Sequence, residues 1–122
     1  MASKIFIDSL LKDIIHPGVQ RLMETQFFSE LREGKLSVKI LQGFAMQHYL
    51  HNESINRGFA LCMVKNAHIP DLYEHFSHQF TEEYHHPNLA KRFGLGIGLK
   101  EEDFKQITPV FECLAHTSAV LR

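Results

Sequence analysis

The chain has 122 residues, which is enough for one small domain with a single hydrophobic core. Apolar residues make up 44% of it and charged residues 22%, ordinary values that give no sign of disorder. The formal net charge of −1 creates no long-range field for nucleic acid or for an anionic membrane surface, so we expect neither as a partner.

The histidines and cysteines indicate how the charge responds to pH and which cellular compartment suits the protein. Nine histidines make the net charge sensitive to pH between about 5 and 8. Cys62 and Cys113 stand far apart within apolar stretches, and the N-terminus carries acids where a secretory signal needs an apolar segment. We therefore expect reduced, buried thiols in a cytoplasmic protein. The most apolar stretch, residues 40–50, contains Gln42, Gln47 and His48, so we expect no membrane span.

The first third of the sequence predicts two helices. Apolar residues recur at helical spacing in residues 5–15, at Ile5, Ile7, Leu10, Leu11, Ile14 and Ile15. His16-Pro17-Gly18 is predicted to break this helix, because proline suits the first turn of a new one. The second helix should then run from Pro17 and stop at Gly34.

The remaining sequence is also helical in pattern. Ser37 is a predicted N-cap for a long third helix that ends at residues 66–70. A fourth helix begins at Asp71, a fifth begins at Pro87 and loosens at residues 94–98, and residues 101–122 form one or two more, broken at Pro109. No convincing strand or hairpin occurs. The sequence predicts an all-α fold with one domain over residues 1–122.

The end of the sequence, residues 110–121, is an apolar helical pattern without a polar tail. A helix this apolar should pack against something. It closes the core of its own domain, or it meets another chain.

Residues 81–86 gather acids and histidines at metal-binding spacing. On a continuous helix, His75, His78, Glu82, His85 and His86 would share one stripe. Glu82 and His86 are four residues apart, and Glu83 and His86 are three apart, the Glu-x-x-His spacing of helical di-iron sites. Such oxygen and nitrogen donors suit iron or manganese. Because Pro87 disfavours helical geometry at His86, the alternative is a polar helix end with surface histidines.

A second cluster lies in the third helix, at residues 47–51. His48 and His51 are three residues apart and could be two metal ligands. Gln47, Tyr49 and Arg57 are polar groups in a largely apolar helix, as in a helix that lines a pocket. The alternative is that Gln47 and Tyr49 are half-buried while the histidines are exposed.

Two segments resemble the haem-oxygenase-like superfamily, in particular the branch of TenA-type thiaminases, pyrroloquinoline-quinone synthase and the chlamydial death-domain-associating protein with its di-iron oxidase relatives. The first, HPGVQRLMETQFFSELREGKLSVKILQGFAMQHYLH, shares the His16-Pro17 start, the EGKLS turn and the aromatic-rich FAMQHYLH. The second, FTEEYHHPNLAKRFGLGIGLKEEDF, has the acid pair, the histidine and the later Glu-Glu turn. The resemblance therefore implies a haem-oxygenase-like helical bundle.

The resemblance also implies roles for individual residues. His86 matches a histidine ligand of the di-iron branch, and Glu82 or Glu83 matches the glutamate before it, so the implied cofactor is iron and no haem is predicted. Gln47 and Tyr49 match pocket-lining positions, and we place His48 with them in the substrate pocket.

Domains of this superfamily are normally longer, so the sequence resembles an N-terminal half. A half-bundle would expose an apolar face that a second copy could cover, so we expect a homodimer or else a shortened chain.

Three functions follow as expectations. The first is an iron-dependent oxidoreductase that acts on a small organic molecule, with Glu82 or Glu83 and His86 as ligands. The second is a TenA-like or cofactor-free protein that binds a small heterocycle. The third is a non-catalytic dimerisation or interaction module.

Overall fold

The computed structural model describes residues 2–121, and for Ala2 and Val120 it describes the backbone alone. The chain divides into two compact units, one ending at Ser37 and the other beginning at Val38. Every regular element within residues 2–121 is helical, which confirms the all-α prediction. Over the same residues, no helix combines the length and the apolarity that a membrane span requires.

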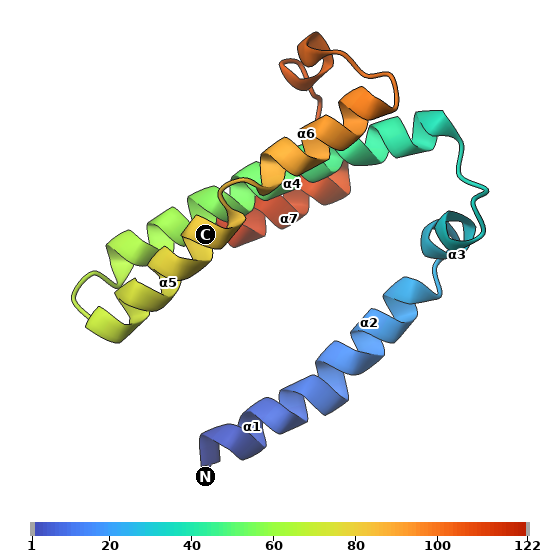
Figure 1. The fold of residues 1–122 in the computed structure, drawn as a ribbon. Helices are drawn as coiled ribbons and strands as arrows, with labels where there is room; N and C mark the ends of the chain where they lie inside the picture. Colours follow the sequence, from blue (N-terminus) through green and yellow to red (C-terminus); the bar gives the residue numbers. More distant parts are fainter. Residues whose placement is uncertain (1, 122) are drawn as a thin grey trace. The chain divides into compact units, whose positions relative to one another are not determined.

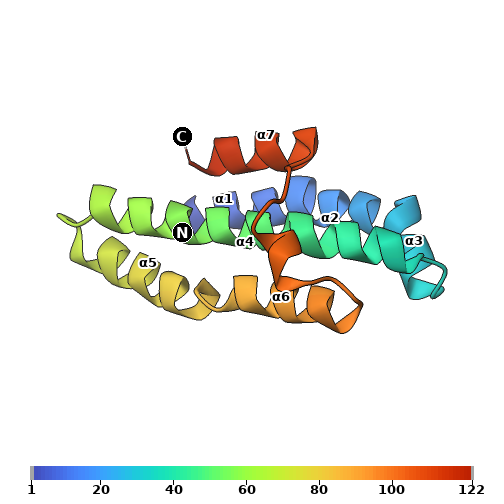
Figure 2. The same ribbon diagram turned by 90° about the horizontal axis from the view of Figure 1, so that it is seen from above.

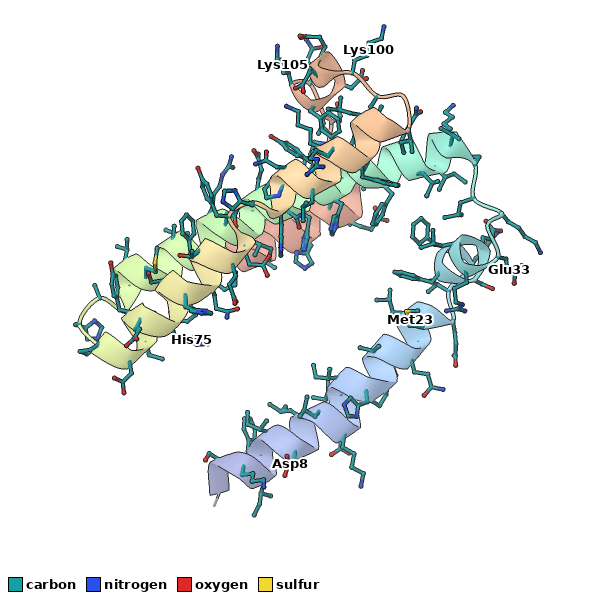
Figure 3. All side chains as sticks on the ribbon, in the orientation of Figure 1. Asp8, Met23, Glu33, His75, Lys100 and Lys105 are labelled. Atoms are coloured by element: carbon teal, nitrogen blue, oxygen red, sulfur yellow. The ribbon has the colours of Figure 1, made fainter. Side chains whose placement is uncertain are left out.

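The N-terminal unit consists of α1 (Ala2–Leu10), the π-helical turn η1 (Leu11–Ile15), α2 (His16–Met23) and α3 (Gln26–Arg32). Its side chains project from all sides of α1 and α2 (Figure 3), and Ile5 is 67% exposed. Helix α3 ends at Arg32, and Gly34, two residues later, has a φ of 66° that lets the Lys35 N–H donate to the Glu30 carbonyl over 2.8 Å. The predicted stop at Gly34 is therefore confirmed.

The predicted break at residues 16–18 is wrong. Ile15 and His16 keep right-handed helical geometry, and the His16 N–H donates to the Leu11 carbonyl five residues earlier. The wider π-helical turn accommodates Pro17, which lacks an N–H and whose ring would crowd a carbonyl of a regular α-helical turn. The break comes instead at Thr25, whose extended backbone separates α2 from α3.

The second unit is organised around one long helix, α4 (Val38–Lys65). Helix α5 (Pro70–Glu83) turns back along α4, and α6 (His86–Gly96) continues along the same side, as Figures 1 and 2 show. A short 3₁₀ turn, η2 (Glu101–Phe104), leads to α7 (Phe111–Val120), which packs on another side of α4. The proline restarts near residues 70, 87 and 109 lie close to their predicted positions.

Small residues let α4 and α6 approach closely. Ala45 of α4 is 1% exposed and Ala90 of α6 is 7% exposed, while Gly94 is buried beside them. A Cβ atom on Gly94 would lie 2.7 Å from Cζ of Phe104 and 3.3 Å from Cβ of Ala45. Phe104, which is only 7% exposed, packs against Gly94 at this contact. There is therefore no room for a side chain at Gly94.

We expect Gly94→Ala to destabilise the chain by about 1–3 kcal/mol, because the added methyl group overpacks the contact with Phe104 and Ala45. This loss should exceed the gain of about 1 kcal/mol in helix propensity. Gly43→Ala, within α4, is the matched control, because no atom lies within 4 Å of its added Cβ, and it should be stabilising. Urea unfolding of both variants tests this, and equal stabilities would contradict it.

Candidate functional site

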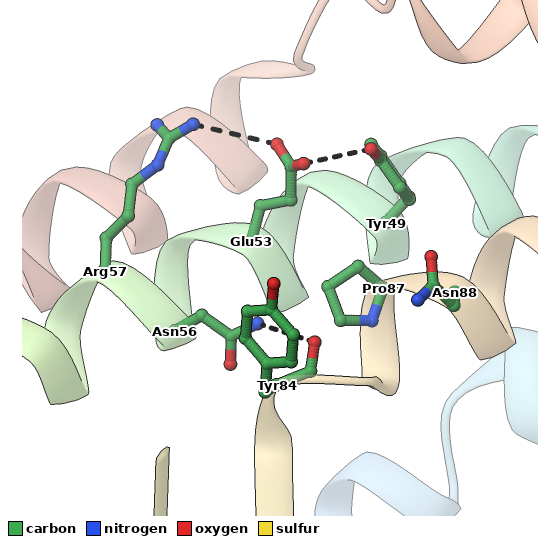
Figure 4. Close-up of a pocket in the computed structure, with 7 residues that line it drawn as sticks. All are labelled: Tyr49, Glu53, Asn56, Arg57, Tyr84, Pro87 and Asn88. Atoms are coloured by element: carbon green, nitrogen blue, oxygen red, sulfur yellow. Dashed lines mark hydrogen bonds and ion pairs between the residues drawn. The ribbon is translucent and has the colours of Figure 1, made fainter. Parts of the chain in front are cut away.

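A cavity of about 300 Å³ lies between α4 and the junction of α5 with α6 (Figure 4). Its lining comprises Tyr49, Glu53, Asn56, Arg57, Tyr84, Pro87 and Asn88. The α4 residues share one side of the helix, since Glu53 stands four residues from Tyr49 and from Arg57 and three from Asn56. The others come from the junction, where α5 ends at Glu83 and α6 begins at His86 with Pro87 in its first turn. We name this cavity the junction pocket.

Three side chains form a polar row along α4. The Tyr49 hydroxyl donates to Oε1 of Glu53 over 2.9 Å, and the Arg57 guanidinium lies 3.7 Å from Oε2 of Glu53. The Arg57 side chain is 68% exposed, so this ion pair is weak and easily broken. Burial, followed by the hydrogen bond to Glu53, raises the pKa of Tyr49 and keeps its hydroxyl a donor near neutral pH.

Asn56 lines the junction pocket and has a side-chain acceptor without a partner in the described part of the chain. Its Nδ2 donates to the Tyr84 carbonyl over 3.4 Å, but its Oδ1 is buried and accepts no hydrogen bond from the residues that the structure describes. A buried acceptor without a partner is costly and rare. Because less than 1 Å² of this atom is exposed, a ligand with an N–H or O–H donor would satisfy it once the Asn56 side chain turns toward the junction pocket.

The structure separates the two glutamates that were candidate metal ligands. Glu83 contacts Nδ1 of His86 across the junction, whereas Glu82 pairs with His78 at 3.5 Å. Helix α5 ends at Glu83, so the continuous stripe through His85 and His86 does not form. In the described part of the chain, no three His, Cys, Asp or Glu side chains are grouped to hold a metal ion. The two donors Glu83 and His86 do not by themselves make an iron site.

Histidines from separate helices meet on α4. The ring centroids of His48 and His51 are 5.7 Å apart, and those of His51 and His116, the latter in α7, are 4.6 Å apart in a T-shaped arrangement. His48 also lines a cavity of about 240 Å³ with His86 and Asn52. Partial burial, then the charge of His86, lowers the pKa of His48. The fold therefore brings a predicted pocket residue beside a predicted metal ligand.

Gln47 holds the segment that enters α7. Its Nε2 donates to the Thr108 carbonyl and its Oε1 accepts from the Val110 N–H, each over 3.0 Å. Its side chain is thus occupied in fixing the chain before α7, and its role in a substrate pocket stays a prediction.

Tyr49, in contrast, lies in the lining of the junction pocket. Glu53, Asn56 and Tyr84 were missed by the sequence reasoning. For Glu53 the sequence did contain a signal, because Tyr49, Glu53 and Arg57 are four residues apart each time and therefore lie on one side of a helix. No local spacing connects Asn56 with Tyr84.

The family is shown by comparison with known proteins. A family model described as the TENA/THI-4/PQQC family matches residues 16–122. The chain therefore belongs to this family, which is part of the haem-oxygenase-like superfamily, and the resemblance inferred from the two sequence segments is confirmed. Comparisons with curated proteins and with solved structures returned no match.

The free energy of unfolding should fall as the pH drops from about 7 to 5, in part because of the protonation of His51. Burial, followed by the charges of His116 and His48, lowers the pKa of His51, and these effects outweigh the opposing Glu83. Below the unfolded pKa of about 6.5, the unfolded chain therefore binds more protons, which favours unfolding.

We expect His51→Gln to reduce this loss of stability, measured as urea midpoints between pH 5 and 8. His68→Gln is the matched control, because His68 is exposed in the turn after α4. An unchanged pH dependence in His51→Gln would contradict the prediction.

Proposed function

We propose that this protein binds a small, planar, nitrogen-containing heterocycle in the junction pocket. The main support for this proposal is Oδ1 of Asn56, a buried acceptor without a partner among the described residues, to which a donor on the ligand could form a hydrogen bond. The carboxylate of Glu53 is a second acceptor in the lining of the same pocket, and Arg57 offers donors. An amino group next to a ring nitrogen has the matching pattern of donor and acceptor.

The aromatic residues of the junction pocket support the same ligand class. Tyr49 and Tyr84 line it together with Pro87, and flat apolar surfaces of this kind suit a planar ring. The volume of about 300 Å³ is at the lower end for small-molecule sites, which favours a single ring over a large cofactor. Membership of the TENA/THI-4/PQQC family is consistent with this proposal.

We expect 4-aminopyrimidine to raise the melting temperature of the wild type in a concentration-dependent way, since a ligand of the native state stabilises it by mass action. Asn56→Leu should weaken binding about tenfold or more, because the donor of the ligand would be buried without a partner, which costs about 1–3 kcal/mol. Asn52→Leu, one turn earlier on α4 and outside the junction pocket, is the matched control and should bind normally. No shift in the wild type, or equal binding by both variants, would refute the proposal.

The second candidate is an iron-dependent oxidoreductase that acts on a small organic molecule. The contact between Glu83 and His86 supports it, because this pair has the Glu-x-x-His spacing and lies beside His48. Two donors are too few, so further ligands would have to come from a second copy.

We propose that the protein forms a homodimer, which would supply the further ligands and cover exposed apolar side chains. Val64 is 75% exposed and Phe111 is 79% exposed, and a second copy could cover such side chains about a two-fold axis. A cytoplasmic location is also part of the proposal, because Cys62 and Cys113 are free thiols, which suits a reducing compartment.

Metal content and particle mass test this second candidate together. Protein expressed with added iron and purified without an affinity tag should contain half an iron or one iron per chain, and light scattering should give the mass of a dimer. His86→Ala should lose the metal, whereas the control His78→Ala, which removes the partner of Glu82, should keep it. A metal-free monomer would refute the oxidoreductase and the dimer, and would leave the junction pocket unaffected.

A further inference from the structure

A second cavity, of about 180 Å³, lies between α4 and α7. It shares Glu53 and Arg57 with the junction pocket, and its other lining residues come from the opposite flank of α4 and from α7. We name it the α7 groove. Its relation to the junction pocket follows from the positions of side chains around α4.

Glu53 stands on the ridge between the two cavities. At about 100° per residue, Tyr49 and Asn56 lie about 40–60° to one side of Glu53, whereas Leu50 and Ser54 lie about 60–100° to the other side. The first two line the junction pocket and the second two line the α7 groove. Only the exposed pair of Glu53 and Arg57, 3.7 Å apart, is common to both, and breaking such a pair costs little.

The polar groups of the α7 groove already have partners within the chain. The Ser54 hydroxyl donates to the Leu50 carbonyl, the Thr117 hydroxyl to the Leu114 carbonyl, and Sγ of Cys113 to the Gln47 carbonyl. What the α7 groove offers a ligand is therefore apolar surface, and the Leu114 side chain is still 51% exposed beside it. The two cavities differ in chemistry, since the junction pocket retains an unused acceptor.

We infer that the α7 groove is a second compartment of the ligand site, and that the ligand is a polar heterocycle carrying an apolar substituent that crosses the ridge at Glu53 into this groove. The inference rests on the proposed function, because the heterocycle occupies the junction pocket. Beyond the proposed function, the inference specifies an apolar substituent on the ligand and gives α7 a part in binding it, since Cys113 and Thr117 line the α7 groove.

The test compares 4-aminopyrimidine with 4-amino-5-butylpyrimidine. Each methylene group that leaves water tightens binding about fourfold, so a butyl chain that enters the α7 groove should tighten binding at least about tenfold. Thr117→Phe, which fills the α7 groove, should abolish this difference between the two probes. Ala115→Phe is the control, because Ala115 lies on α7 outside the α7 groove, and it should keep the difference.

The two thiols provide a readout that needs no substitution. The butyl compound should slow alkylation of Cys113 by iodoacetamide at alkaline pH, whereas 4-aminopyrimidine should not, and Cys62 serves as the internal control because it lies outside the α7 groove. Peptide mapping by mass spectrometry separates the two rates. Slower alkylation of Cys113 alone supports the inference.

The outcomes separate the two claims. Equal affinity for both probes with Cys113 unprotected would overturn the second compartment and leave the junction pocket intact. A preference for the butyl compound that survives in Thr117→Phe would also overturn it, because the chain would then lie elsewhere. Failure of both probes to bind would overturn the proposed function together with this inference.

Discussion

The close contact between α4 and α6 is the constraint on which the second unit depends. Ala45 and Gly94 permit this approach because neither carries a side chain beyond Cβ, and Phe104 covers its end. With α6 fixed along α4, the junction before it must lie over the middle of α4. The junction pocket is therefore a consequence of packing between small residues, and its polar lining can vary without loss of the contact that positions it.

Helix α4 organises everything else in this unit by presenting different residues to different neighbours. Tyr49 and Asn56 face the junction, Leu50 and Ser54 face α7, and Glu53 stands between them. Gln47 fixes the entry of α7 through two hydrogen bonds to backbone groups, at the Thr108 carbonyl and the Val110 N–H. A single helix thus contributes to a polar and to an apolar compartment, and the two differ because Asn56, on the junction side, keeps an acceptor without a partner within residues 2–121.

The helical pattern predicted most of the elements, and its failures have local causes. The stop at Gly34 and the restart at Pro87 follow from backbone preferences that a single residue imposes. Pro17 was misread because a π-helical turn can accommodate a proline without ending the helix, and apolar spacing does not distinguish this turn from a break. The choice between Glu82 and Glu83 depended on where α5 ends, and the structure pairs Glu83 with His86 across that end.

The sequence by itself determined the all-α class, the family, and those pairs whose members stand three or four residues apart, such as Tyr49 with Glu53 and Glu83 with His86. These features are local, because helical geometry fixes which neighbours meet. The tertiary structure decided which distant groups come together. Asn56 reaches the Tyr84 carbonyl 28 positions away, and Gln47 reaches the Thr108 carbonyl 61 positions away. The unsatisfied acceptor of Asn56 and the groove beside Cys113 exist only because α6 and α7 pack on different sides of α4, and packing of that kind is not encoded in any local spacing.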